Sequence, residues 1–223
     1  VNDAGLALAA STMGGTFSGT ATTGNITDTG ALAITGTTTL VTSANDATIT
    51  LDTTTNAFTG AMTITTNDAS GTDADVTIDG GTTALVIAAS TVDGDLSLRT
   101  GNASGITDTG TVTVGGNFTG TTDANNGVIN MGSMAVDGTF TLAPNNTGAV
   151  TIVNDAGLAL AASTMGGTFS GTATTGNITD SGTLAITGLA TFTTSTSDAT
   201  ITLDETGSTF AAGVSLNTTG SSG

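Results

Sequence analysis

Six aspartates near the middle of the chain are its densest group of side chains that could do chemistry. Two carboxylates at a suitable separation can cleave a glycosidic bond, which makes a polysaccharide-degrading enzyme one alternative. Most of the six lie in turns rich in Gly and Thr, however, and no Lys or His accompanies them. We therefore predict that the protein is not an enzyme and assign no catalytic residue. The cluster comprises Asp68, Asp73, Asp75, Asp79, Asp93 and Asp95.

Three further aspartates recur at the same place of a repeated motif and raise the question of a metal site. Asp28, Asp108 and Asp180 each follow Ile-Thr and precede a Gly by two residues. Aspartate oxygens suit Ca²⁺, but the simpler role is an Asp-turn in which each carboxylate bonds its own backbone. The chain has no Cys and no His, which are the usual ligands of zinc. We predict no metal site and no cofactor.

Threonine pairs of the form Thr-x-Thr suggest a different function. Outward ranks of Thr on a solenoid are the active surface of ice-binding proteins, so ice binding is an alternative. Thr is also a good outward-facing strand residue in general. In the sequence the pairs do not fall at a constant spacing. They are Thr48/Thr50, Thr63/Thr65, Thr111/Thr113, Thr139/Thr141 and Thr200/Thr202.

Composition restricts the class of protein and its partners. The chain has 223 residues and a formal net charge of −17, with Arg99 as its single base, so we predict that it binds no nucleic acid. Only 9% of residues are charged, and apolar residues alternate with polar ones, which argues against disorder. The longest apolar run, residues 84–89, is too short to span a bilayer. We expect no membrane insertion and a secretion signal outside these residues.

Repetition is the dominant feature of the sequence. The motif at residues 26–36 returns at 106–116 and 178–188, and the opening Val1-Asn2-Asp3 returns as Val153-Asn154-Asp155, an offset of 153 − 1 = 152. We predict one continuous repeat segment over 1–223, with a first large repeat at 1–152 and a partial second copy at 153–223. Positions that stay apolar in both copies predict the core face: Leu40/Phe192, Ile49/Ile201, Leu51/Leu203, Phe58/Phe210, Met62/Val214 and Ile64/Leu216.

A shorter beat predicts the fold class. The pattern apolar-x-Gly-x-apolar occurs around Gly94, Gly116 and Gly138, spaced by 116 − 94 = 22 and 138 − 116 = 22. Seven such units account for the 152-residue period, which is typical of solenoids. We predict an all-β, right-handed parallel β-solenoid (β-helix) with coils of about 22 residues. The alternative is a series of tandem Ig-like β-sandwiches, whose hairpins would use the Asp-Gly and Asn-Gly pairs.

Several alternating segments resemble a known family. Residues 154–160, 90–98, 105–114 and 46–52 resemble the repeat regions of large bacterial exoproteins of the filamentous-haemagglutinin kind, which are secreted by two-partner systems or as autotransporters. The resemblance covers essentially the whole chain as a texture of repeats. It implies a β-helical shaft at the bacterial cell surface or released from it, serving adhesion, aggregation or a fibrous coat.

Together these observations predict an extracellular structural or adhesive repeat protein that forms a stiff shaft or fibre. We expect end-to-end or fibre self-association, and a surface receptor or glycan as the external partner. Specific binding would fall on outward residues that differ between the two copies. These are Thr37/Leu189, Thr53/Glu205 and Asn56/Ser208.

Overall fold

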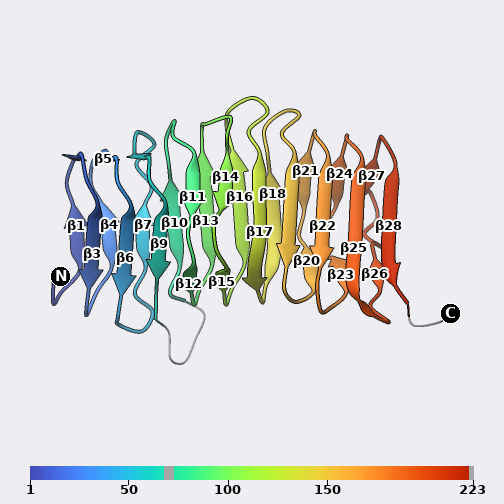
Figure 1. The fold of residues 1–223 in the computed structure, drawn as a ribbon, viewed down its shortest axis with the longest axis horizontal. Coiled ribbons are helices and arrows are strands. Elements are labelled where there is room, and N and C mark those ends of the chain that lie inside the picture. Colours follow the sequence, from blue (N-terminus) through green and yellow to red (C-terminus); the bar gives the residue numbers. More distant parts are fainter. Residues whose placement is uncertain (68–72, 221–223) are drawn as a thin grey trace.

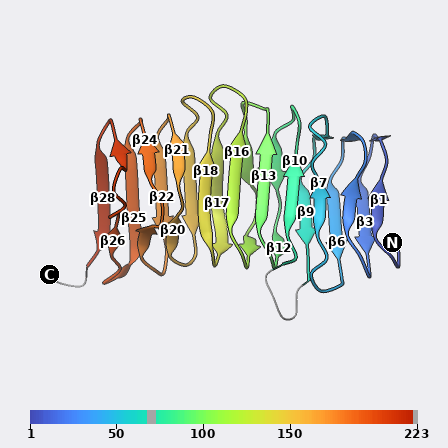
Figure 2. The same cartoon turned by 180° about the vertical axis from the view of Figure 1, so that it is seen from behind.

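The computed structural model describes residues 1–67 and 73–220, and these contain only strands, turns and loops. Strands run across the long axis of the molecule and follow one another from the N-terminus at one end to the C-terminus at the other (Figure 1). Viewed from behind, β7, β10, β13, β16 and β18 follow one another along the same axis (Figure 2). Asp68 of the aspartate cluster lies outside the described residues.

One ten-stranded sheet receives a single strand from each coil. Its strands alternate apolar residues toward the core with polar residues toward solvent, as in β13, where Leu96 and Leu98 are buried and Arg99 is exposed. In spatial order the strands are β1 (Leu6–Leu8), β4 (Ile26–Asp28), β7 (Ile49–Leu51), β10 (Val76–Asp79), β13 (Leu96–Thr100), β16 (Phe118–Thr122), β18 (Thr139–Ala143), β20 (Leu158–Leu160), β23 (Ile178–Asp180) and β26 (Ile201–Thr202).

The other sides of the coils form a twelve-stranded sheet and two small sheets. The twelve-stranded sheet contains β3 (Phe17–Ala21), β6 (Thr38–Thr42), β9 (Met62–Thr65), β11 (Leu85–Ile87), β12 (Ser90–Val92), β14 (Ile106–Asp108), β15 (Val112–Val114), β17 (Ile129–Val136), β19 (Val150–Asn154), β22 (Phe169–Ala173), β25 (Ala190–Ser197) and β28 (Val214–Thr219). The small sheets are β2 (Ser11–Met13), β5 (Leu32–Ile34) and β8 (Ala57–Phe58), and β21 (Ser163–Met165), β24 (Leu184–Ile186) and β27 (Thr209–Phe210).

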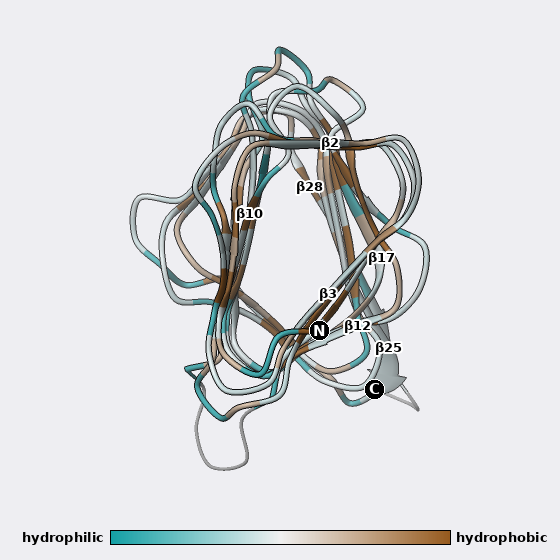
Figure 3. Cartoon of the chain, turned by 90° about the vertical axis from the view of Figure 1, so that its left-hand side faces the viewer, coloured by the Kyte–Doolittle hydropathy of each residue, from teal (hydrophilic) through white to brown (hydrophobic). Residues whose placement is uncertain are grey.

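Every strand pairing among the described residues is parallel, and partners are one coil apart in sequence. The step is 20 residues from Leu6 to Ile26 and 27 from Ile49 to Val76, around an average of about 22. Looking along the axis, the coils superimpose as closed rings (Figure 3). The predicted parallel β-solenoid is confirmed, with about ten coils. The Ig-like alternative is wrong, because sandwiches require antiparallel hairpins, whereas Asp93-Gly94 and Asn126-Gly127 lie between parallel strands.

The core is a column of aliphatic side chains with stacked phenylalanines. Phe169 and Phe192 lie 5.2 Å apart between ring centroids, and Phe118 and Phe140 lie 5.9 Å apart. All six first-copy residues that were predicted to face inward are buried: Leu40, Ile49, Leu51, Phe58, Met62 and Ile64. Of their second-copy counterparts only Phe192 is buried. The others belong to the last described coil, which no further described coil covers.

Glycines at one corner allow neighbouring coils to touch. A Cβ placed on Gly36 would come within 2.5 Å of the backbone carbon of Gly15, and one on Gly60 within 2.4 Å of the Gly36 carbonyl oxygen. These residues do not have positive φ, so they are needed for close approach and not for a left-handed turn. The left-handed corners that the sequence leads us to expect occur elsewhere, for example at Asp46 and Asn126, with φ of 59° and 62°.

Strands β1 to β9 recur as β20 to β28 at the same positions plus 152, and seven coils separate β1 from β20. The ladder does not follow this copy register strictly. Phe140 pairs with Leu160, which puts Leu160 in the column that begins at Leu6, although the copy of Leu6 is Leu158. The ten-stranded sheet therefore shifts by two residues where β18 meets β20.

Candidate functional site

The predicted aspartate cluster is divided between two structural roles. Asp75 Oδ1 accepts a hydrogen bond of 2.7 Å from the backbone N–H of Asp95, one coil further on. Asp95 Oδ1 in turn accepts one of 2.6 Å from the N–H of Asn117. Asn117 Oδ1 accepts the N–H of Thr139 at 2.9 Å. The carboxylates of Asp75 and Asp95 thus connect successive coils.

This connection is part of a column that we call the Asx column. Its members are the Asn or Asp residues that directly precede the first inward residue of a strand in the ten-stranded sheet, and each accepts a backbone N–H from the next coil. They are Asn25, Asp75, Asp95, Asn117 and Asn177. A polar side chain at this corner satisfies a donor of the following coil that lies outside the regular ladder.

The three motif aspartates also bond across coils, which corrects the expected Asp-turn. Asp108 Oδ1 and Oδ2 accept the N–H groups of Gly132 at 2.9 Å and Ser133 at 2.6 Å. Asp180 Oδ1 accepts the N–H of Asp204 at 3.0 Å. Asp28 Oδ2 accepts the side-chain amide of Asn56 at 2.7 Å. The turn is too open for a local bond, and the stacked coil offers donors instead. No group of three metal-binding side chains occurs among residues 1–67 and 73–220.

Asn56, one of the positions expected to be outward and variable, is 1% exposed. Its Oδ1 accepts the N–H of Leu32 at 2.8 Å. Its copy Ser208 accepts the equivalent bond from Leu184 at 3.0 Å, so the substitution preserves a bond between coils. Of the other two pairs, Thr37 and Glu205 are exposed, and Leu189 is 47% exposed. Only these two pairs, Thr37/Leu189 and Thr53/Glu205, have a member on the outer surface.

Hydroxyl side chains form continuous ranks on the outside of the shaft. One rank on the ten-stranded sheet, the hydroxyl rank, stacks in register over six coils and consists of Thr27, Thr50, Thr77, Ser97, Thr119 and Thr141. The column two residues further along each strand is mixed, because Asp79 pairs with Arg99 and Arg99 with Thr121. The ranks are therefore single files and not regular arrays of Thr-x-Thr.

A hollow beside this rank surrounds the single arginine, and we call it the arginine hollow. Arg99 Nε lies 2.7 Å from Asp123 Oδ2 and 3.9 Å from Asp79 Oδ2. Burial raises the pKa of Asp79, although the N–H of Gly81, 2.7 Å from its Oδ1, and the nearby Arg99 act against the rise. The hollow has a volume of about 340 Å³ and is lined by Asp52, Thr54, Thr77, Ile78, Asp79, Ser97, Arg99 and Thr121.

Sequence reasoning had placed Asp79 in the aspartate cluster and had missed Asp52 and Asp123. The structure separates Asp79 from the Asx column and brings it to the two missed residues. The available signal was the coil spacing, because Asp79, Arg99 and Thr121 are separated by 20 and 22 residues. Once the coil register is known, such spacing predicts neighbours on one face.

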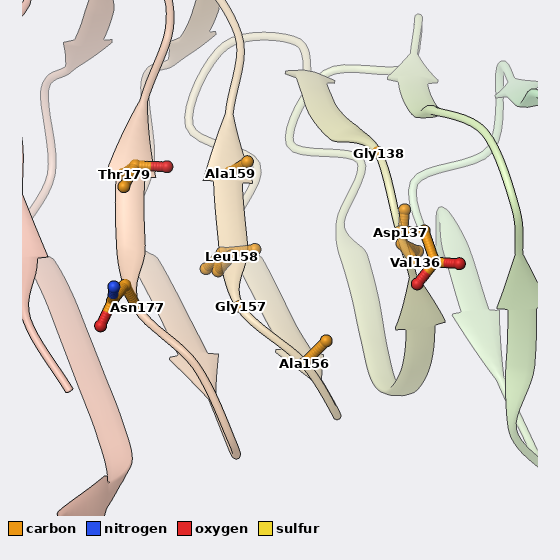
Figure 4. A pocket seen from close by; sticks show the side chains of 9 residues that line it. All are labelled: Val136, Asp137, Gly138, Ala156, Gly157, Leu158, Ala159, Asn177 and Thr179. Atoms are coloured by element: carbon orange, nitrogen blue, oxygen red, sulfur yellow. The ribbon is translucent and has the colours of Figure 1, made fainter.

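A second hollow, of about 240 Å³, lies where β18 meets β20 and the register shifts (Figure 4). Its lining is mostly small or apolar, including Val136, Gly138, Gly157 and Leu158. Asn177 also lines it, but its Oδ1 is engaged by the N–H of Thr200 at 2.8 Å. This hollow is a consequence of the shifted ladder and offers few free polar groups to a ligand.

In the part of the chain that the structure describes, no helix has the length and apolar character needed to cross a membrane.

Comparison with known proteins identifies a family of repeats. A family model described as repeats of unknown function (DUF5649) matches residues 1–65, 73–133 and 147–217. No curated protein and no solved structure matches the chain. The family match and the solenoid together support a repeat region of a β-helical protein.

Proposed function

The chain belongs to the DUF5649 family of repeats, and we propose that it forms a stiff extracellular shaft with a structural and adhesive role at the bacterial cell surface. The observation that carries this proposal is the unbroken parallel ladder of the ten-stranded sheet from β1 to β26. Ten coils at about 4.8 Å per coil make a rod of about 50 Å. Repetition of such coils extends reach without a new fold.

Bonds between side chains and the next coil support a mechanical role. The Asx column, the motif aspartates and the buried Asn56 and Asn154 all join one coil to another. In a solenoid each coil contacts only its neighbours, so the strength of each junction limits the whole rod. Side chains that satisfy donors outside the ladder make every junction harder to open.

An exposed location agrees with the chemistry of the surface. The chain carries 18 acidic residues against one base, which keeps parallel shafts apart, and it has no Cys that could be oxidised. The resemblance to filamentous-haemagglutinin-like exoproteins points to the same location. We propose no catalytic step, because the acids of the aspartate cluster are engaged in bonds between coils or paired with Arg99.

Surface display tests this function. Residues 1–223 displayed on a non-adhering bacterium should produce adhesion to glycan-bearing cells or autoaggregation, and electron microscopy of the isolated chain should show rods of about 50 Å. Compact separate beads, or displayed rods that neither adhere nor aggregate, would contradict the proposal.

Ice binding is the second candidate, and the six-coil hydroxyl rank is the observation in its favour. The charged neighbours Asp79 and Arg99 interrupt the adjoining column. A thermal-hysteresis measurement on the isolated chain decides between the two: a freezing-point gap would favour ice binding, and its absence would leave the shaft.

A further inference from the structure

We propose that the arginine hollow is a binding subsite for an uncharged saccharide. This inference rests on the proposed adhesive function and names the class of ligand that the shaft would hold. The argument uses the unpaired donors and acceptors of the hollow, its charge, and its position on the hydroxyl rank.

The guanidinium of Arg99 is held on one side and open on the other. Its Nε donates to Asp123, while neither terminal nitrogen donates a hydrogen bond to any described residue. The side chain is 54% exposed, so these four N–H groups face solvent beside the hollow. A guanidinium that is already oriented by carboxylates can donate two parallel bonds to neighbouring oxygens at a reduced entropic cost.

Acceptors and hydroxyls stand opposite these donors. The exposed carboxylate of Asp52 forms no hydrogen bond or ion pair with the rest of the described chain. The hydroxyls of Thr77, Ser97 and Thr121 likewise have no hydrogen-bond partner there. Adjacent hydroxyls of a sugar ring both donate and accept hydrogen bonds, so they match a set that contains donors, acceptors and hydroxyls together.

Charge excludes the two other simple classes of ligand. Asp52, Asp79 and Asp123 against Arg99 give a local charge of 1 − 3 = −2, within a chain of net charge −17, and this repels carboxylated or sulfated ligands. A cation would meet the guanidinium, which already pairs with two of the three carboxylates. An uncharged ligand rich in hydroxyls avoids both penalties.

The size and position of the hollow fit an extended ligand. A volume of about 340 Å³ lies at the lower end of the range for small-molecule sites. Thr77 and Ser97 belong both to the hollow and to the hydroxyl rank, which continues to Thr27 on one side and Thr141 on the other. An oligosaccharide seated at Arg99 can therefore lie along the rank.

The single arginine makes a direct test available. It contributes one side-chain Nε–H resonance to the ¹⁵N spectrum, which we would follow during titration with neutral hexamers of glucose, mannose, galactose and N-acetylglucosamine, and with a hexuronate of equal length. We expect a saturable shift with at least one neutral hexamer and none with the hexuronate. Arg99→Lys and Asp52→Asn should each weaken binding roughly ten- to a hundredfold.

Thr151→Ala, on the twelve-stranded sheet, is the matched control and should bind as the wild type does. Asp52 makes no bond within the described chain, so Asp52→Asn should fold normally and keeps the test valid if the Arg99 variant unfolds. No shift with any neutral hexamer, or tighter binding of the hexuronate, would overturn the subsite. Adhesion of displaying cells that survives both substitutions would also overturn it while leaving the shaft function intact.

Discussion

At the scale of single residues, polar side chains in this protein mainly complete the junctions between coils. Asn56 is an example, since it is buried and bonds the N–H of Leu32 and the carboxylate of Asp28. A buried polar group left without its partner costs about 1–3 kcal/mol. The polarity of the core boundary is therefore a source of stability and of coil register.

Replacing Asn56 with Ala should destabilise the protein by about 2–4 kcal/mol, because it leaves the Leu32 N–H and Asp28 Oδ2 without a buried partner. Urea denaturation followed by circular dichroism measures the change. Asn56→Ser is the matched control, because Ser208 accepts the equivalent bond in the second copy, and it should cost clearly less. Equal losses for Ala and Ser would show that the bond to Leu32 is unimportant.

Asp79 should make stability depend on pH. Burial raises the pKa of its carboxyl in the folded protein above the ordinary value of 3.8, so the folded state binds the proton more tightly than the unfolded state. The contribution of this group to stability therefore falls as pH rises from about 3.8 through the folded pKa.

Asp79→Asn removes this titration while leaving the site uncharged. We expect the wild type to lose stability relative to the variant as pH rises through that window, measured as the difference between their urea midpoints. Asp137→Asn, at an exposed corner, is the control for the change in net charge. A difference between wild type and Asp79→Asn that stays constant with pH would contradict the raised pKa.

At the scale of elements, the spacing of coils depends on glycines at one corner. The backbone N–H of Gly36 donates to Gly15 O at 3.1 Å, and that of Gly116 to Gly94 O at 3.0 Å. The 22-residue beat of the sequence is the sequence record of this contact, because a side chain at these positions would enter the neighbouring coil.

Gly36→Ala should cost about 1–3 kcal/mol, since its Cβ would lie 2.5 Å from the backbone of Gly15 and the coils must separate to admit it. Gly14→Ala has open space around its Cβ and is the matched control, expected to be neutral or slightly stabilising. Thermal or urea unfolding distinguishes the two. Equal stabilities would show that the corner adjusts without strain.

At the scale of the whole molecule, apolar side chains of the outermost described coils are less covered than those within the stack. Val214 is 42% exposed and Leu216 is 58% exposed, and Leu6, Leu8, Met13 and Phe17 are only partly buried. An uncovered coil also leaves strand N–H and C=O groups unpaired, which favours pairing with another chain.

Leu216→Asp should therefore reduce end-to-end association of the isolated chain, measured by sedimentation velocity at several concentrations. Leu189→Asp adds the same charge at an apolar residue of similar exposure, 47%, on the side of the shaft, and it should leave association unchanged. Salt should strengthen association of the wild type, because it screens the repulsion between chains of net charge −17. If the Leu189 variant loses association equally, the contact is lateral and not end to end.

The sequence by itself determined the fold class, the coil length and the core face. Alternating apolar residues specify which side of a strand is buried, and duplicated positions such as Leu40/Phe192 repeat that information, so local pattern suffices. It also indicated that the aspartate cluster need not be catalytic.

Only the tertiary structure decided which polar residues meet. Coil steps vary from 20 to 27 residues, so neighbours on a face cannot be assigned from an average period. This variation hid the Asx column, the buried position of Asn56 and the meeting of Asp52, Asp79 and Asp123 around Arg99. Local spacing specifies which face a residue occupies, whereas the lengths of the intervening loops set the register that selects its partners.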